Sequence, residues 1–170
     1  GAYYLSANLT GASGPSGIRI TASNVTLDLG GFALLGVAGS VHGVTVIGPQ
    51  RNIAVRNGTV RDWGSSGVLA LNAENSQFTD LRLSNNAQVG LAVGVGGAVS
   101  GSTAIGNGNT GISASQRATI SDSTALSNLL HGISAGPASV VSRCTANANT
   151  SSGISAGLGS VLTDNAAGAN

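Results

Sequence analysis

The chain has 170 residues, of which 41% are hydrophobic and only 8% are charged, and its formal net charge is +1. High hydrophobicity with little charge argues against intrinsic disorder, and a near-neutral chain without an arginine cluster argues against nucleic acid as a partner. No stretch of about 18 consecutive apolar residues is present, so we predict no membrane span.

The first segment, residues 1–16, precedes any repeat and carries Tyr3, Tyr4 and Leu5. A stack of coils exposes an apolar cross-section and unpaired backbone at each end. We therefore expect residues 1–16 to form an N-terminal cap or edge, in which the two tyrosines cover the cross-section. The sequence begins without methionine or a charged, apolar leader, which is consistent with a processed, exported protein or with a trimmed chain.

From residue 17 onward, a glycine followed by an aliphatic residue recurs through the chain. The spacing is 26, 24 and 23 residues at first and then 21 residues three times, at Gly17, Gly43, Gly67, Gly90, Gly111, Gly132 and Gly153. Within each repeat, apolar residues alternate with Ser, Thr or Arg, as in "ATISDSTA", and this is the period of a β-strand. Short strands without a helical stretch predict coils that stack at about 4.8 Å.

Aliphatic residues keep the same register from one repeat to the next. One column is Leu27, Val55, Phe78, Val99, Ile120, Val141 and Leu162, and a second is Leu83, Ala104, Ala125 and Ala146. We expect each column to form an inward ladder, and the small alanines to make the interior narrow. The prediction is an all-β solenoid of about seven coils in one domain, residues 1–170, with coils over residues 17–170 and regular 21-residue repeats from residue 90.

Asparagine forms the most regular column. Its members are Asn86, Asn107, Asn128, Asn149 and Asn170. Asn tolerates the left-handed conformation that sharp turns require, and a stacked side-chain amide can donate to the next carbonyl group along the column. We therefore predict a structural asparagine ladder at a turn. Trp63 occupies the equivalent position one coil earlier, so the ladder begins after it.

These glycines, aliphatic ladders and turn asparagines resemble those of the right-handed parallel β-helix repeat proteins, the pectate-lyase-like superfamily. The opening "GAYYLSANLTG" with "GIRITASNVTLDLGGFALLG" is similar to the N-terminal part of secreted bacterial members. The resemblance covers nearly the whole chain, and it implies the fold and an extracellular or cell-surface location. It implies no single function, because the superfamily includes lyases, hydrolases, epimerases, adhesins and proteins of no known activity.

Superfamily enzymes that cleave acidic polysaccharides use clustered aspartates with arginine or lysine on one outer face, often with calcium. In this chain, Asp122, Arg143 and Asp164 follow one another in one column. The two carboxylates would lie about 9.6 Å apart, near the upper limit for an inverting glycosidase pair. The intervening arginine keeps both ionised, however, whereas a general acid needs a raised pKa. We therefore favour a surface charge ladder, with these residues as an alternative catalytic set.

No metal or cofactor site is predicted. His42 and His131 each precede a repeat glycine, and no other His, Cys or acidic residue recurs at their positions. Neither a metal site nor a catalytic triad can therefore be assembled, and two turn histidines are the favoured interpretation. The single cysteine, Cys144, replaces serine in an inward column, so we expect a buried, inert thiol and no disulfide.

Hydroxyl groups form outward columns. One contains Thr103, Thr124 and Thr145, and its neighbour contains Thr79, Ser100, Ser121, Ser142 and Thr163. Similar ladders occur in ice-binding solenoids, but these columns mix Ser with Thr and are interrupted by Arg82, so ice binding is a minor alternative. Carbohydrate platforms require exposed aromatic rings, for which Tyr3, Tyr4 and Trp63 are the candidates.

The sequence ends on the asparagine column, at Asn170, without a helix or charged strand that would cover the last coil. We expect either that the chain is a fragment of a longer protein or that this edge pairs with a partner. The first coil of another copy could be that partner, which would give a non-closing contact and a fibre. Our hypothesis is a secreted structural protein that assembles end to end with itself, into an extracellular fibre or a surface layer, through Tyr3, Tyr4, Leu5 and Asn170. We favour a protein that is not an enzyme over an enzyme. The alternative is a carbohydrate-binding or adhesion module, or a polysaccharide-active lyase-like or hydrolase-like enzyme, with a polysaccharide as its partner.

Overall fold

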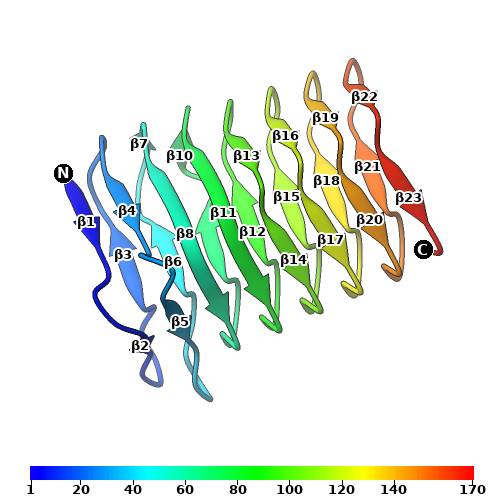
Figure 1. Cartoon of the computed structure of the whole chain (residues 1–170). Helices are drawn as coiled ribbons and strands as arrows, with labels where there is room; N and C mark the ends of the chain where they lie inside the picture. Colours follow the sequence, from blue (N-terminus) through cyan, green and yellow to red (C-terminus); the bar gives the residue numbers. More distant parts are fainter.

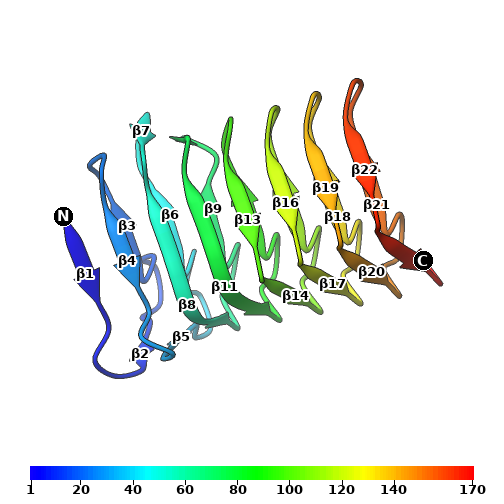
Figure 2. The same ribbon diagram turned by 45° about the horizontal axis from the view of Figure 1, so that its top comes forward.

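The computed structural model describes all 170 residues, which form 23 short β-strands and no helix. Equivalent strands of neighbouring coils pair in parallel, so the chain winds into a stack with its termini at opposite ends (Figure 1). A tilted view shows that equivalent strands keep the same rows along the stack (Figure 2). The fold is therefore a parallel β-helix. No α-helix long and apolar enough to cross a membrane is found in it.

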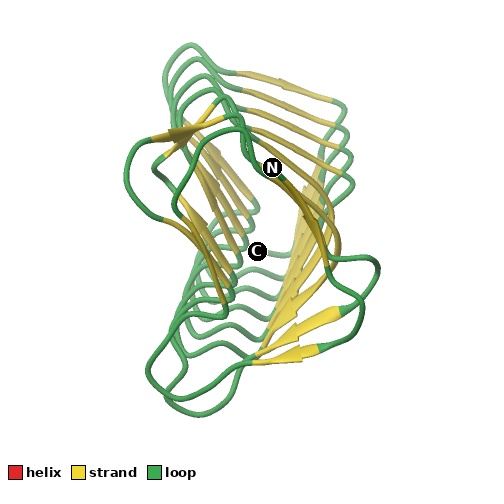
Figure 3. Ribbon diagram, turned by 90° about the vertical axis from the view of Figure 1, so that its left-hand side faces the viewer, coloured by secondary structure: helices red, strands yellow, loops and turns green.

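The strands form three faces around a common interior (Figure 3). Buried hydrophobic side chains fill this interior. Face I contains β1 (Ala2–Tyr4), β4 (Thr26–Asp28), the first part of β8 (Ala54–Arg61) and of β11 (Gln77–Ser84), β13 (Ala98–Ser100), β16 (Thr119–Ser121), β19 (Val140–Ser142) and β22 (Val161–Thr163). Face II contains β2 (Leu9–Thr10), β5 (Ala33–Leu35), the second part of β8 and of β11, β14 (Thr103–Ile105), β17 (Thr124–Leu126), β20 (Thr145–Asn147) and β23 (Ala166–Gly168). Face III contains β3 (Ile18–Ile20), β6 (Val44–Val46), β9 (Val68–Ala70), β12 (Leu91–Val93), β15 (Ile112–Ala114), β18 (Ile133–Ala135) and β21 (Ile154–Ala156). Two further strands, β7 (Gln50–Arg51) and β10 (Ala73–Glu74), pair at the corner between faces III and I.

The inward columns predicted from the sequence are in register. On face I, Val99 pairs with Ile120 and Ile120 pairs with Val141, and all three are at most 1% exposed. The alanine column on face II is paired in the same way. These residues belong to a cluster of 31 buried hydrophobic residues, in which burial of each large side chain contributes about 1.5–3 kcal/mol. Leu162, which belongs to the face I column, differs because it lies in the last coil and is 48% exposed.

Residues 1–16 add two strands to the stack. β1 pairs with β4 and β2 pairs with β5, so faces I and II have eight strands each and face III has seven. The spacing of the repeat glycines predicted only seven coils because each of these glycines precedes a strand of face III, and face III has seven strands. Tyr3 and Tyr4 are 61% and 79% exposed, and with Leu5 they line an apolar mouth of about 390 Å³ at the N-terminal end. The tyrosines therefore border the interior without closing it.

Each coil after β10 turns at three residues that have a left-handed backbone. In one coil these corner residues are Arg117, Asp122 and Ser127, with φ of 60°, 50° and 53°. The preceding coil has glycine at all three corners, at Gly96, Gly101 and Gly106. Because the left-handed conformation costs a non-glycine residue about 1–2 kcal/mol, the corners account for many of the Gly, Asn and Asp residues in the repeats.

The asparagine ladder is confirmed. Nδ2 of Asn128 donates to the backbone oxygen of Ala104 at 3.1 Å and to Oδ1 of Asn149 at 3.0 Å. Oδ1 of Asn128 accepts from the backbone N–H and from Nδ2 of Asn107, both at 3.0 Å. Asn107 makes the same set of bonds one step earlier. Asn86, Asn107, Asn128 and Asn149 are all at most 2% exposed. Each ladder asparagine therefore satisfies polar groups in two neighbouring coils.

One part of the turn prediction is wrong, because the ladder asparagines themselves do not have a left-handed backbone. That conformation belongs to the residue immediately before each of them, for example Asn85, Ser127 and Ala148. The ladder position requires asparagine because its side chain both donates and accepts inside the protein, where an unpaired polar group is costly.

The repeat glycines lie directly against this ladder. A Cβ atom on Gly132 would lie 2.6 Å from Nδ2 of Asn149 and 2.6 Å from the backbone oxygen of Gly153. A Cβ atom added to another of these glycines would also lie 2.6 to 2.9 Å from Nδ2 of the next ladder asparagine, and this holds for Gly67, Gly90, Gly111 and Gly153. From Gly67 onward, the glycines that mark the repeat are therefore required by close approach to the ladder, and not by a left-handed turn.

Trp63 forms the base of the ladder. Its backbone N–H donates to Oδ1 of Asn86 at 3.2 Å, and its indole Nε1 donates to the backbone oxygen of Leu34 at 3.3 Å. The ring packs against Gly11 and Gly17, where an added Cβ would lie 2.5 and 2.6 Å from it. A single buried indole thus fills the interior of the first coils in place of asparagine amides.

Replacing Asn128 with leucine should leave the backbone N–H and one Nδ2–H of Asn107 without an acceptor, and the carbonyl group of Ala104 without its side-chain donor. We expect a loss of roughly 1–3 kcal/mol for each buried group without a partner, measured as a lower free energy of unfolding in urea. Gln116→Leu is the matched control, because Gln116 is an exposed amide, and it should change stability by less than about 0.5 kcal/mol. Equal stabilities for Asn128→Leu and the control would mean that the ladder is not structural.

Candidate functional site

A continuous row of polar side chains follows the corner between faces I and II. Strand residues alternate between the interior and the outside. The residue just before each corner residue and the residue two positions after it therefore point outward, whereas the residue directly after the corner, such as Leu81 or Ser123, is buried. We call this row the corner strip. Its members are Asp28, Arg56, Thr79, Ser100, Ser121, Ser142 and Thr163 on face I, Asn57, Asp80, Gly101, Asp122, Arg143 and Asp164 at the corner, and Thr59, Arg82, Thr103, Thr124 and Thr145 on face II.

Ion pairs hold the side chains at the N-terminal end of the corner strip. Nε of Arg56 donates to Oδ2 of Asp28 at 2.9 Å. The same carboxylate accepts from the backbone N–H of Gly30 at 2.8 Å, and the bonds from Gly30 and Arg56 lower the pKa of Asp28. Arg61, which lies outside the strip at the end of β8, forms a second ion pair, with Asp62. Both aspartates are therefore held as partners of arginine.

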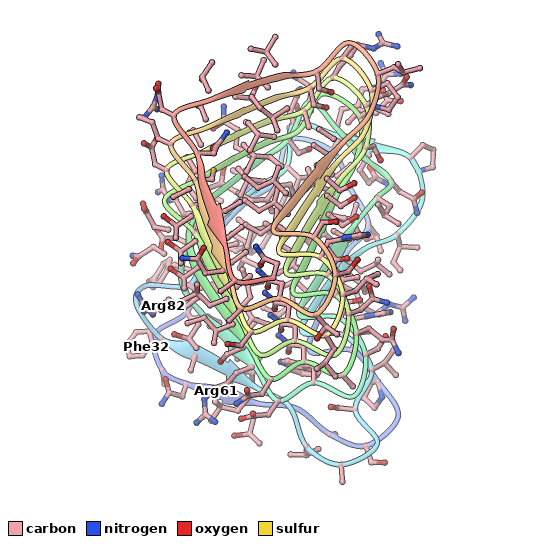
Figure 4. All side chains as sticks on the ribbon, turned by 90° about the vertical axis from the view of Figure 1, so that its right-hand side faces the viewer. Phe32, Arg61 and Arg82 are labelled. Carbon is pink, nitrogen blue, oxygen red and sulfur yellow. The ribbon has the colours of Figure 1, made fainter.

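Arg82 differs from these arginines because no carboxylate oxygen lies within 4.0 Å of its guanidinium. Its Nε donates instead to Oγ1 of Thr59 at 3.0 Å. The backbone N–H of Thr59 donates to the backbone oxygen of Phe32 at 3.0 Å, and Phe32, Arg61 and Arg82 project from the same side of the molecule (Figure 4). We call Phe32, Thr59, Arg61 and Arg82 the arginine patch. It combines an aromatic ring with a guanidinium that can bind an anionic group in a bidentate manner.

The alternative catalytic set lies further along the same strip. Nε and Nη2 of Arg143 donate to Oδ1 and Oδ2 of Asp122 at 2.6 and 2.8 Å, and these bonds lower the pKa of Asp122. Asp122, Arg143 and Asp164 all have a left-handed backbone, with φ of 50°, 52° and 55°. Aspartate is among the residues that tolerate this conformation, so the turn by itself accounts for the two aspartates of the column. An ionised carboxylate chelated by arginine is a poor general acid, so the geometry supports binding better than acid catalysis.

The histidines and the cysteine do not come together into a site. Nδ1 of His42 accepts a hydrogen bond from the backbone N–H of Ser66 at 3.2 Å, whereas Nδ1 of His131 is buried without a partner. Cys144 is 1% exposed, and burial raises the pKa of its thiol, which makes it a poor nucleophile. No group of three or more His, Cys, Asp or Glu side chains is placed to hold a metal ion.

The arginine patch and the pair formed by Asp28 and Arg56 were not predicted from the sequence. Asp28 and Arg56 are separated by 28 residues, so the repeat of 21 residues does not align them with one another. Phe32 lies in an insertion of the first coils, which the same repeat does not align with Arg82. A signal was nevertheless present. Asp28 follows Leu27 and Arg56 follows Val55, and an alignment on that inward column would have brought the two charges together.

The sequence of residues 16–168 matches the family model described as a right-handed beta helix region. The chain belongs to the right-handed β-helix family. This assignment agrees with the parallel pairing of all three faces. No curated protein matches the chain in sequence.

Two solved structures share this β-helix fold. A mutant of the periplasmic alginate epimerase AlgG superposes with a TM-score of 0.53 and 13% identity over 96% of this chain, which spans 47% of the epimerase. The A-module of the mannuronan C-5 epimerase AlgE4 of Azotobacter vinelandii gives a TM-score of 0.61 and 14% identity over 97% of this chain and 68% of the module. Identities this low show a common fold and transfer no residue role.

Proposed function

We propose that this β-helix is a non-catalytic module that binds an extended acidic polysaccharide along the corner strip. The observation that carries the proposal is the register of the strip, whose outward positions recur once per coil at about 4.8 Å. A polysaccharide presents hydroxyl and carboxylate groups in a repeating row. A protein surface that also repeats can contact several sugar rings at once, and many weak contacts then add up along the chain.

The arginine patch supports an acidic ligand. The guanidinium of Arg82 has a hydroxyl partner and no carboxylate partner, so a carboxylate of the ligand would complete its ion pairing. The side chain of Phe32 on the same side offers an apolar surface for the C–H face of a sugar ring.

The ion pairs favour binding over catalysis. Asp28, Asp62 and Asp122 are each paired with an arginine, and paired carboxylates stay ionised. The two solved neighbours are epimerases of alginate and of mannuronan, which supports a polysaccharide as the ligand class. The periplasmic neighbour also supports a location outside the cytoplasm, in the periplasm or the extracellular space.

Binding to alginate, polygalacturonate and a neutral glucan, measured by isothermal titration calorimetry, tests this proposal. We expect binding to the acidic polymers only, without release of any product. Arg82→Ala should weaken it about tenfold or more, because a hydrogen bond to a charged group contributes about 1.5–3 kcal/mol.

The control is Arg117→Ala. Arg117 lies at a different corner, is exposed and has no carboxylate partner. Alanine is tolerated there, because the next coil has Ala138 at the same position. Binding that is absent, or that both variants weaken equally, would contradict the proposal. Formation of modified or cleaved polysaccharide would favour the enzyme alternative.

End-to-end assembly is a second proposal, and one specific observation favours it. The strands β1, β2 and β3 of the first coils and β22, β23 and β21 of the last coils lie on the same three faces in the same order. Stacking one molecule on another would therefore continue all three parallel sheets. It would also bring the apolar mouth at Tyr3 and Tyr4 against the exposed side chains of Leu158 and Leu162.

Light scattering on the 170-residue chain tests assembly. We expect the molecular mass to rise with concentration, and Leu162→Lys to prevent that rise because a charge would be buried without a partner. Thr119→Lys, at an exposed outward position of a central strand, is the control and should leave assembly unchanged. A constant monomer mass at high concentration would rule out the fibre.

A further inference from the structure

The longer first coils form a groove on the outside of face III. Its volume is about 440 Å³, within the usual range of small-molecule sites. One side is formed by the loops around Ser16 and His42, the floor by Arg19 and Thr45, and the other side by residues near Asn72. The groove lies on a different face from the corner strip.

The charge of the groove is positive. Arg19 points outward from β3, and it is in register with Thr45 on β6. No carboxylate oxygen lies within 4.0 Å of the guanidinium of Arg19, and the residues that line the groove include no Asp or Glu. An anion in the groove would therefore meet an unpaired guanidinium and no opposing carboxylate.

His42 adds a directed donor. Because the backbone N–H of Ser66 donates to Nδ1 of His42 at 3.2 Å, the proton of the neutral ring is on Nε2. Burial lowers the pKa of His42, so the ring is neutral at pH 7. Nε2 has no partner within the protein and is not among the buried atoms that lack one, so it is available to a ligand as an N–H donor.

The loops that carry these groups are tied to one another. The backbone N–H of Gly17 donates to the oxygen of His42 at 2.8 Å, and the N–H of Val41 donates to the oxygen of Pro15 at 3.2 Å. A third backbone bond, of 2.8 Å, joins the N–H of Gly14 to the oxygen of Gly39. The groove is therefore held open by main-chain bonds, and a ligand does not have to order the loops.

The remaining lining is suited to a ligand with both apolar and polar faces. Val41, Ile47 and Leu69 provide apolar surface, while Thr45 and Asn72 provide a hydroxyl and an amide. Ile47 is 39% exposed, so its aliphatic side chain is accessible to a ligand. A sugar ring has this combination of a C–H face and hydroxyl edges.

The geometry points to a binding site for a small hydroxylated anion, of the class of the sugar acids and sugar phosphates, in this groove. Arg19 binds the anionic group, Nε2–H of His42 and the amide of Asn72 bind hydroxyl groups, and Val41 with Leu69 packs against the ring. The site accepts one residue or a free monosaccharide, in contrast to the extended ligand proposed for the corner strip.

Titration of the 170-residue chain with four probes, followed by nuclear magnetic resonance of the ring nitrogens of His42, tests the site. The probes are glucuronate, glucose 6-phosphate, glucose and inorganic phosphate. We expect saturable shifts with at least one of the first two probes, and the response separates a carboxylate from a phosphate ligand. Glucose should bind at least tenfold more weakly.

Arg19→Gln should weaken the binding of the anionic sugar at least tenfold, whereas Arg117→Gln, which changes an equally unpaired arginine outside the groove, should leave it unchanged. Both variants should retain wild-type stability, because both side chains are exposed. No shift with either anionic sugar would overturn the site, as would glucose binding as tightly as glucuronate. Inorganic phosphate binding as tightly as glucose 6-phosphate would also overturn it, because only an adventitious anion would then be recognised.

Discussion

From Asn86 to Asn149, the side-chain amide of each ladder asparagine donates to a backbone oxygen of one coil and to the next asparagine. The repeat glycines leave the space in which the amide lies. The two columns depend on one another. A side chain on Gly132 would collide with Nδ2 of Asn149, while loss of the amide would leave buried backbone groups without partners. This contact fixes how far each coil is shifted relative to the next. The aliphatic columns, the corners and the outward rows therefore have the same register.

The same constraint separates the regular part of the molecule from the part that can carry a specific site. Coils of 21 residues place identical positions above one another, so they produce long rows such as the threonines and serines of the corner strip and no deep concavity. The first coils contain insertions, and Trp63 fills their interior in place of the ladder. The three main cavities are lined only by residues from these coils. The regular coils are therefore suited to an extended ligand, and the irregular first coils are suited to a small one.

Much of the fold could be predicted from the sequence because the register is strict after Gly90. The inward column of Val99, Ile120 and Val141 and the asparagine ladder follow directly from the repeat. The left-handed corners could not be placed, since the residue before each ladder asparagine is Asn, Gly, Ser or Ala and shows no constant type. The arginine patch and the groove were missed because they depend on insertions, where spacing no longer indicates which residues are neighbours. The Asp122 column was recognised, but only the structure shows that Arg143 chelates its carboxylate.

The dependence of the fold on contact between glycine and asparagine is tested most directly by the free energy of unfolding of Gly132→Ala. We predict a loss of about 1–3 kcal/mol or more, because the added methyl group has no space beside Asn149. Gly168→Ala is the matched control: its added Cβ would lie 3.7 Å from Oδ1 of Asn147, the nearest atom, and its backbone is not left-handed, so stability should be unchanged or slightly higher. If Gly132→Ala were as stable as Gly168→Ala, the ladder and the glycine column would be independent, and the mutual dependence of the two columns would be contradicted.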